Sequence, residues 1–175
     1  MIRAAITVRM ARGGLEEVPT LRLGDYLQED FVLWDLPCLD KSSFMKDLVA
    51  RVVALLPAVD EQELLDRLLA REAQQSTGIG GGLALPHAIV SGLERTVLVV
   101  GRPRGGLDFA ALDSEPVDLI FLLLSPTNAD EKHLRLLARL ARILSPEETL
   151  VQLRTASGPK ELFQMLLEQD ARHAY

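Results

Sequence analysis

Apolar residues recur every three or four positions in two segments of the chain, which is the spacing of one face of a helix. The first segment covers residues 42–56, where Ser42 or Ser43 is predicted to cap the helix and a proline follows its end. The second starts after Asp60, which is followed three residues later by a glutamate, as in a capping box. This second helix carries Arg71 near its C-terminal end.

Continuous apolar runs predict four strands. These runs are FVLWDL (31–36), LAL (83–85), RTVLVVGR (95–102) and VDLIFLLL (117–124). The last run is typical of a strand that is covered by helices on both faces of a sheet.

The C-terminal third of the chain is predicted to be helical. A long helix covers residues 129–144 and is capped by Asn128, and two shorter helices begin at Pro146 and Ser157, the second ending near Glu168. Because strands and helices are mixed along the whole chain, the expected fold is a three-layer α/β domain.

The composition is that of a globular protein, since 48% of the 175 residues are hydrophobic and 25% are charged. We expect one domain over residues 21–170, with residues 1–20 as an N-terminal extension or an added strand. The net charge of −6 argues against nucleic-acid binding, which needs a basic surface. No apolar stretch reaches the ~20 residues that cross a bilayer, so we expect a cytoplasmic protein without membrane insertion. The single cysteine, Cys38, excludes a disulfide framework.

A glycine-rich loop, STGIGGG (76–82), follows the second predicted helix. No Gly-Lys-Ser/Thr follows it, as a P-loop requires, and Leu83 stands where a dinucleotide-binding fingerprint has its third glycine. A nucleotide site is therefore not predicted. Backbone N–H groups of such a loop can instead surround an anion.

Two histidines are candidates for chemistry. His87 follows Pro86, which keeps the preceding residue extended, so the ring emerges at the end of a short strand, where sites on α/β sheets collect. The residues alone leave a structural and a functional interpretation of His87 open. His133 lies in the first turn of the predicted 129–144 helix, in the middle of its apolar stripe, which by itself is typical of a buried core residue.

The sequence lacks the residues that a metal site or a serine hydrolase site would require. His87 and His133 are 46 residues apart and have no cysteine or acidic third ligand at a recognisable spacing, so no metal site is predicted. The sequence contains no Gly-x-Ser-x-Gly nucleophile elbow, so a serine hydrolase is not predicted either.

The stretch REAQQSTGIGGGLALPHA (71–88) resembles the active-site motif of the enzyme IIA components, fructose/mannitol type, of the bacterial phosphoenolpyruvate-dependent phosphotransferase system. That motif is an arginine–glutamate pair, a Ser-Thr-Gly-Ile-Gly loop and a Pro-His ending. The segments DFAALDSEPVDLIFLLLSP (108–126) and EKHLRLLARLARIL (131–144) agree with it, and the likeness covers about residues 21–168. The fold it implies is a small mixed β-sheet with helices on both faces.

The resemblance implies that His87 accepts a phosphoryl group from a histidine phosphocarrier protein and passes it on. It places Arg71 and His133 beside the phosphate. We expect these three side chains to converge on one pocket, with their rings and guanidinium close enough to share one phosphate. The loop is expected to add phosphate contacts through Ser76, Thr77, Gly78 and Gly80. Neither a metal nor a cofactor is implied.

The ending Pro-His-Ala and the segment DSEPVD favour the nitrogen-regulatory branch of this family. The acceptor would then be a regulatory target protein. Two alternatives stay open: a sugar-specific component that passes the phosphoryl group to an enzyme IIB, and an interaction module of the same fold without phosphotransfer.

Overall fold

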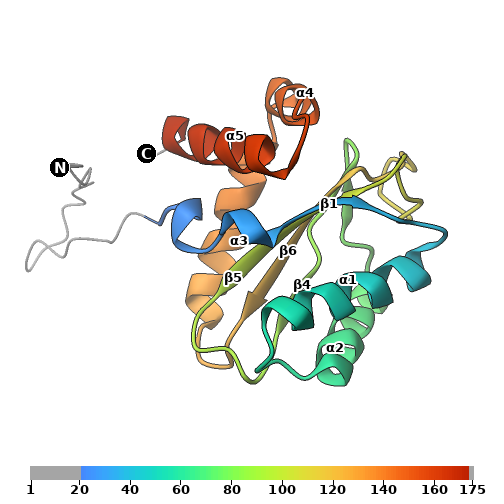
Figure 1. Cartoon of the computed structure of the whole chain (residues 1–175), viewed down its shortest axis with the longest axis vertical. Helices are drawn as coiled ribbons and strands as arrows, with labels where there is room; N and C mark the ends of the chain where they lie inside the picture. Colours follow the sequence, from blue (N-terminus) through green and yellow to red (C-terminus); the bar gives the residue numbers. More distant parts are fainter. Residues whose placement is uncertain (1–20, 174–175) are drawn as a thin grey trace, which may run out of the picture.

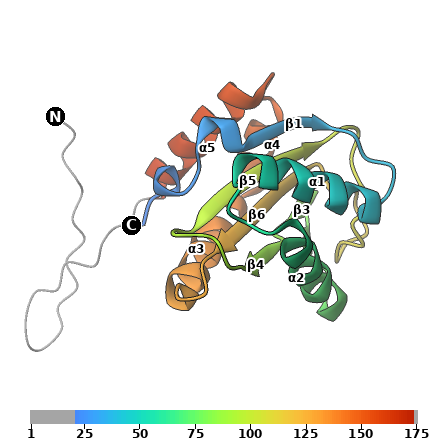
Figure 2. The same ribbon diagram turned by 60° about the horizontal axis from the view of Figure 1, so that its bottom comes forward.

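The computed structural model describes residues 21–173, so the extension predicted at 1–20 lies outside the described residues. The predicted three-layer α/β fold is confirmed (Figures 1 and 2): a mixed sheet lies between α1 and α2 on one face and α3, α4 and α5 on the other. The helices are α1 Lys41–Leu55, α2 Glu61–Gln74, α3 Asp130–Leu144, α4 Glu147–Arg154 and α5 Pro159–Arg172.

The sheet has the strand order β1-β5-β6-β3-β2, and β4 also pairs with β6. Its strands are β1 Val32–Leu36, β2 Gly78–Gly80, β3 Leu83–Ala84, β4 His87–Ile89, β5 Val97–Pro103 and β6 Leu119–Ser125. The strands β3 and β4 run parallel to β6, whereas β5 runs antiparallel to it. Every residue of β6 is buried, as predicted for a strand that is covered on both faces. Two short 3-10 helices, Leu23–Asp25 and Glu29–Phe31, precede β1.

The starts of the first two helices depend on aspartates. The prediction that Ser42 or Ser43 caps α1 is wrong: the carboxylate of Asp40 accepts hydrogen bonds from the Ser43 amide at 2.9 Å and the Ser43 hydroxyl at 2.7 Å. A carboxylate at this position satisfies a free amide of the first turn. Asp60 caps α2 as predicted, accepting from the Glu63 amide at 2.7 Å.

Two later helix starts also differ from the prediction. Asn128 does not cap α3; the cap position is Ala129, without a side-chain bond, and the acidic first turn stabilises the positive end of the helix dipole. The last helix starts at Pro159 rather than Ser157, because proline fits the first helical position and the Glu161 carboxylate accepts from the Ser157 amide at 2.8 Å.

The part of the chain predicted as a loop contains extra short strands. Residues 78–80 of the glycine segment form β2, which pairs with β3 in a hairpin, and β4 begins at His87 itself. Between β3 and β4 the chain is interrupted at Pro86, yet both strands pair with β6 along the same edge. His87 is therefore the first residue of the sheet after this interruption and pairs with Leu123 of β6. Within residues 21–173, no helix combines the length and hydropathy needed to cross a membrane.

Candidate functional site

His87 is the first residue of β4 and is half-buried. Its Nδ1 atom lies 2.9 Å from the carbonyl oxygen of Leu85. A carbonyl oxygen can only accept a hydrogen bond, so Nδ1 carries the ring proton in the neutral imidazole. The lone pair of His87 is therefore on Nε2.

Arg71 faces this lone pair from the last turn of α2. Its Nε donates to Nε2 of His87 at 3.1 Å, and its Nη1 donates to the carbonyl oxygen of Gln75 at 3.0 Å. The guanidinium is thus held against His87 by the end of its own helix. One N–H group, already directed at Nε2, is placed to meet a negatively charged group bonded there.

His133 lies in the first turn of α3, which covers the face of the sheet opposite to α2. Its side chain is 5% exposed, and its ring centroid lies 5.4 Å from that of His87, with the ring planes tilted by 57°. The Nδ1 atom of His133 lies 2.8 Å from the Ser125 hydroxyl. Three elements, α2, β4 and α3, therefore place Arg71, His87 and His133 next to one another.

Both imidazoles are kept in their neutral form. Burial lowers the pKa of His87, and the charge of Arg71 lowers it further, against the opposing effect of the hydrogen bond to Leu85. Burial also lowers the pKa of His133, and the neighbouring His87 adds to this decrease. Since an ordinary histidine has a pKa of about 6.5, this lowering makes the neutral form of both rings predominant at pH 7.

The loop residues predicted to bind phosphate make other contacts. The Ser76 hydroxyl donates to the carbonyl oxygen of Phe109 at 2.9 Å and accepts from the Gly78 amide at 3.2 Å. The amide and hydroxyl of Thr77 both donate to the Glu72 carboxylate, the hydroxyl at 2.5 Å. These bonds hold the loop beside the site, but they use the hydroxyls of Ser76 and Thr77.

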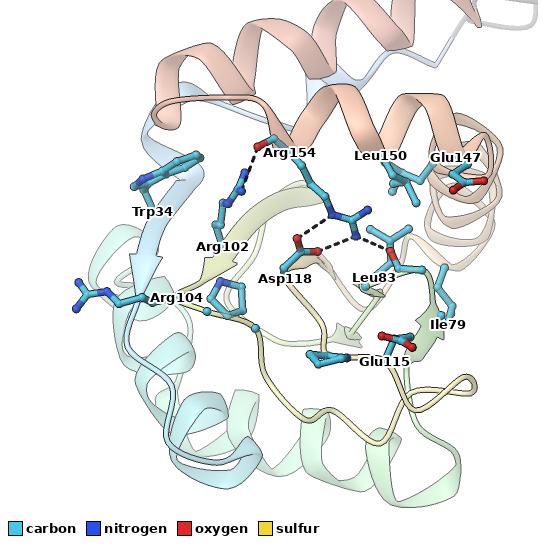
Figure 3. Close-up of a pocket in the computed structure, with 18 of the residues that line it drawn as sticks. Trp34, Ile79, Leu83, Arg102, Arg104, Glu115, Asp118, Glu147, Leu150 and Arg154 are labelled. Carbon is cyan, nitrogen blue, oxygen red and sulfur yellow. Dashed lines mark hydrogen bonds and ion pairs between the residues drawn. The ribbon is translucent and has the colours of Figure 1, made fainter.

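Gly80 lies at the far end of the β2–β3 hairpin, paired with Leu83 and next to the Asp113 carboxylate. It belongs to the lining of a different pocket, of about 1050 Å³, to which Arg71, His87 and His133 do not contribute. In Figure 3 the Arg154 guanidinium of this pocket lies between the Asp118 carboxylate and the hairpin. The structure therefore separates Gly80 from the two histidines.

Several contacts of the site are not predicted by the sequence. Lys41 of α1 donates to the Glu72 carboxylate at 2.5 Å, so the glutamate beside Arg71 is held by both a helix and the loop. Ser125, the last residue of the apolar strand β6, directs its hydroxyl to His133. The feature of the sequence that points to this contact is a polar residue at the end of an otherwise apolar strand. No group of three potential metal ligands occurs among the residues that the structure describes.

The sequence matches, over residues 25–169, the family described as phosphoenolpyruvate-dependent sugar phosphotransferase system, EIIA 2. The chain belongs to this family. It is 35% identical over 148 residues to a nitrogen regulatory protein of Pseudomonas aeruginosa, covering 85% of this chain and 96% of that protein.

Two further relatives represent both branches of the enzyme IIA family. A fructose-specific EIIA component of Haloferax volcanii is 34% identical over 109 residues, covering 62% of this chain and 71% of that component. The crystal structure of the nitrogen regulatory protein IIA-Ntr of Neisseria meningitidis has a TM-score of 0.75 and 30% identity, covering 82% of this chain and 97% of the other. The enzyme IIA fold and a role in the phosphotransferase system follow from these relationships.

Proposed function

We propose that this enzyme IIA is a phosphocarrier whose His87 accepts a phosphoryl group on Nε2. One observation carries the proposal: the carbonyl oxygen of Leu85 accepts a hydrogen bond from Nδ1, so that the lone pair lies on Nε2, which faces Arg71, with the ring of His133 close by. Imidazole suits this task because a neutral ring is a nucleophile and its phosphorylated form is a competent donor.

The proposed transfer exchanges one nitrogen–phosphorus bond for another. The Nε2 lone pair of His87 attacks the phosphorus of a phosphohistidine on the donor protein, a histidine phosphocarrier. The bond to the donor imidazole breaks, and its electron pair returns to the donor ring. The proton on Nδ1 stays hydrogen-bonded to Leu85, so His87 needs no general base.

The two neighbours of His87 stabilise the transferred group. Phosphoryl transfer depends mainly on positioning and on stabilising the charge of the three equatorial oxygens. The Arg71 guanidinium, which contacts Nε2 in the free protein, turns its N–H groups to these oxygens. Neutral His133 donates one N–H group to the same phosphoryl group. Of the loop residues, Thr77 and Ser76 support the site through Glu72 and Phe109.

The acceptor distinguishes the two branches of the family. We place the protein in the nitrogen-regulatory branch, in the cytoplasm, where its phosphorylation state would be read by a regulatory target protein. The relative from Pseudomonas aeruginosa, aligned over almost its whole length, supports this placement. A sugar-specific component would instead pass the group to the cysteine of an enzyme IIB.

The proposal is tested by incubating the protein with phosphoenolpyruvate, the first enzyme of the relay and the histidine phosphocarrier, followed by intact mass spectrometry. We expect the mass of one phosphoryl group, lost on acid treatment and not formed with His87→Gln. His173→Gln is the matched control, since this histidine lies at the end of α5 and outside the site. Absence of the adduct with a cognate donor would contradict the proposal and favour an interaction module.

Once phosphorylated, the protein can be mixed with an enzyme IIB from the same cell. Retention of the phosphoryl group, together with phosphorylation-dependent binding of a different protein, is the outcome expected for a regulator. Rapid loss of the group to the enzyme IIB would reassign the chain to sugar transport.

A further inference from the structure

Two buried hydroxyl groups lie next to the Nδ1 atom of His133. Ser125 is the last residue of β6 and is 0% exposed, and Thr96 immediately precedes β5 and is 2% exposed. The antiparallel register pairs Val97 with Leu124, which brings Thr96 opposite Ser125. Their oxygens are 3.0 Å apart, and the Ser125 oxygen lies 2.8 Å from Nδ1 of His133. We call Thr96 and Ser125 the hydroxyl pair.

The direction of these hydrogen bonds follows from counting protons. The Thr96 hydroxyl has one proton to donate, and among residues 21–173 the Ser125 oxygen is the only acceptor within reach. Buried hydroxyl groups are almost always hydrogen-bonded, so Thr96 donates to Ser125. Ser125 then has its own proton left for Nδ1 of His133, which must accept.

The opposite direction leaves the proton of the Thr96 hydroxyl without an acceptor and is also unfavourable once a phosphoryl group is bound. If Nδ1 of His133 donated to Ser125, Ser125 would donate to Thr96, and the Thr96 proton would have no acceptor among the described residues. The Nε2 atom of His133 would then present a lone pair to a negatively charged phosphoryl group. Leaving a buried donor without an acceptor costs free energy, so the first direction is preferred.

We propose that the hydroxyl pair positions His133 by fixing its proton on Nε2, so that this nitrogen is a hydrogen-bond donor before the phosphoryl group arrives. The consequence for phosphotransfer rests on the proposed function of His87, whereas the proton position does not. Thr96 and Ser125 act through His133 and touch no reacting atom, so they are positioning residues. The sheet itself, through the register of β5 and β6, thereby orders a side chain on α3.

The proton position can be read directly from the ¹⁵N chemical shifts of His133 in the unphosphorylated protein at pH 7.5. We expect the Nε2–H form in the wild-type protein. Ser125→Ala and Thr96→Val remove one hydroxyl each, and we expect a mixture of the two neutral forms or the Nδ1–H form. The matched variants Ser125→Thr and Thr96→Ser keep the hydroxyl while changing the packing, and they should keep the Nε2–H form.

The same variants should differ in phosphotransfer. We expect the rate of phosphorylation of His87 to fall about tenfold in Ser125→Ala and Thr96→Val, since the proton with which His133 would bond the phosphoryl group is no longer held on Nε2. The rate should stay near that of the wild-type protein in the two hydroxyl-keeping variants. If the two residues had a purely structural role, the phosphorylation rate would depend on the change in packing and not on the presence of the hydroxyl. Circular dichroism and the melting temperature identify any variant that fails to fold, and the partner residue then supplies the test.

Two results would overturn the proposal: an Nδ1–H form of His133 in the wild-type protein, or an unchanged Nε2–H form in both hydroxyl-lacking variants. Failure of the proposed function is a separate result. In that case the wild-type protein would not be phosphorylated at all, while the proton of His133 could still be measured and would still support or overturn the role of the hydroxyl pair.

Discussion

Arg71 joins two elements at the site, because its Nε contacts His87 of β4 while its Nη1 contacts the carbonyl oxygen of Gln75 at the end of its own helix. A planar guanidinium can make both contacts at once, whereas an ammonium group is a single point of charge. The shape of the side chain therefore matters here in addition to its charge. At this scale the chemistry depends on which nitrogen of each ring carries the proton.

Substitution Arg71→Lys keeps the charge and removes the planar group. We expect the rate of His87 phosphorylation to fall about 10- to 100-fold, the effect of losing a hydrogen bond to a charged group. Arg67→Lys is the matched control, since Arg67 lies one turn earlier on α2, is 58% exposed and pairs with Glu63. Rates are measured by rapid quench and intact mass. Equal rates for the two variants would contradict the role of Arg71.

The β2–β3 hairpin is the element whose role differs most from the expectation. Gly82 has a φ of +74°, and a Cβ atom there would meet the guanidinium of Arg154 and, at 2.7 Å, the Asp118 carboxylate. Arg154 also donates to the carbonyl oxygen of Gly81 at 2.5 Å, which ties the hairpin to α4 (Figure 3). This glycine therefore allows a close approach between elements.

Gly82→Ala tests this role in stability. Gly105→Ala is the matched control, because Gly105 has a similar φ of +77° but no atom within 4 Å of an added Cβ. We expect a loss of unfolding free energy of about 1 kcal/mol for Gly105→Ala, from the backbone alone, and about 3 kcal/mol for Gly82→Ala, from backbone and crowding together. Urea denaturation measures both. Equal losses would mean that the approach of Arg154 does not require glycine.

The sequence predicted elements best where they are long. The buried runs of β5 and β6 and the apolar stripes of α1, α2 and α3 extend over enough residues to show a pattern. The two- and three-residue strands β2, β3 and β4 do not, and their pairing with each other and with β6 depends on contacts far apart in the chain. The caps at Asp40 and Ala129 differ because several polar residues near each helix start compete for one position.

The candidate site, like the helices and strands, could be predicted only in part from the sequence. Arg71, His87 and His133 could be named from the motif and the helix stripe, and the structure places them together. The hydroxyl pair could not be named, because Thr96 and Ser125 meet only through the register of two strands. The amides of the glycine loop could face either His87 or the pocket beside Arg154. Which of the two they face depends on the direction of the β2–β3 hairpin, and the sequence does not specify that direction.

At the scale of the whole molecule, the two neutral histidines make the free energy of unfolding depend on pH. Burial lowers the folded-state pKa of His87 and His133 below the unfolded value of about 6.5. In the interval between these values the unfolded chain binds more protons than the folded protein does. The contribution to the free energy of unfolding is therefore complete above about pH 6.5 and is lost as the pH falls through the folded-state pKa values.

We expect the free energy of unfolding, measured by urea denaturation, to decrease between pH 7.5 and pH 5.5. The double variant His87→Gln/His133→Gln should show a flatter profile over this interval. Carboxylates whose pKa is lowered, such as Glu72 and Asp113, lose their contribution only below their ordinary pKa of about 4, outside the interval. An equally steep profile in the double variant would show that the histidines are not the cause.

The most direct test of the account is to locate the phosphoryl group on His87 itself. The protein, labelled with ¹⁵N and phosphorylated through the histidine phosphocarrier, is studied by NMR for coupling between phosphorus and the ring nitrogens. The geometry predicts phosphorus on Nε2 of His87, with the proton of Nδ1 still hydrogen-bonded to Leu85. Phosphorus on Nδ1 of His87, or on His133, would contradict the central claim.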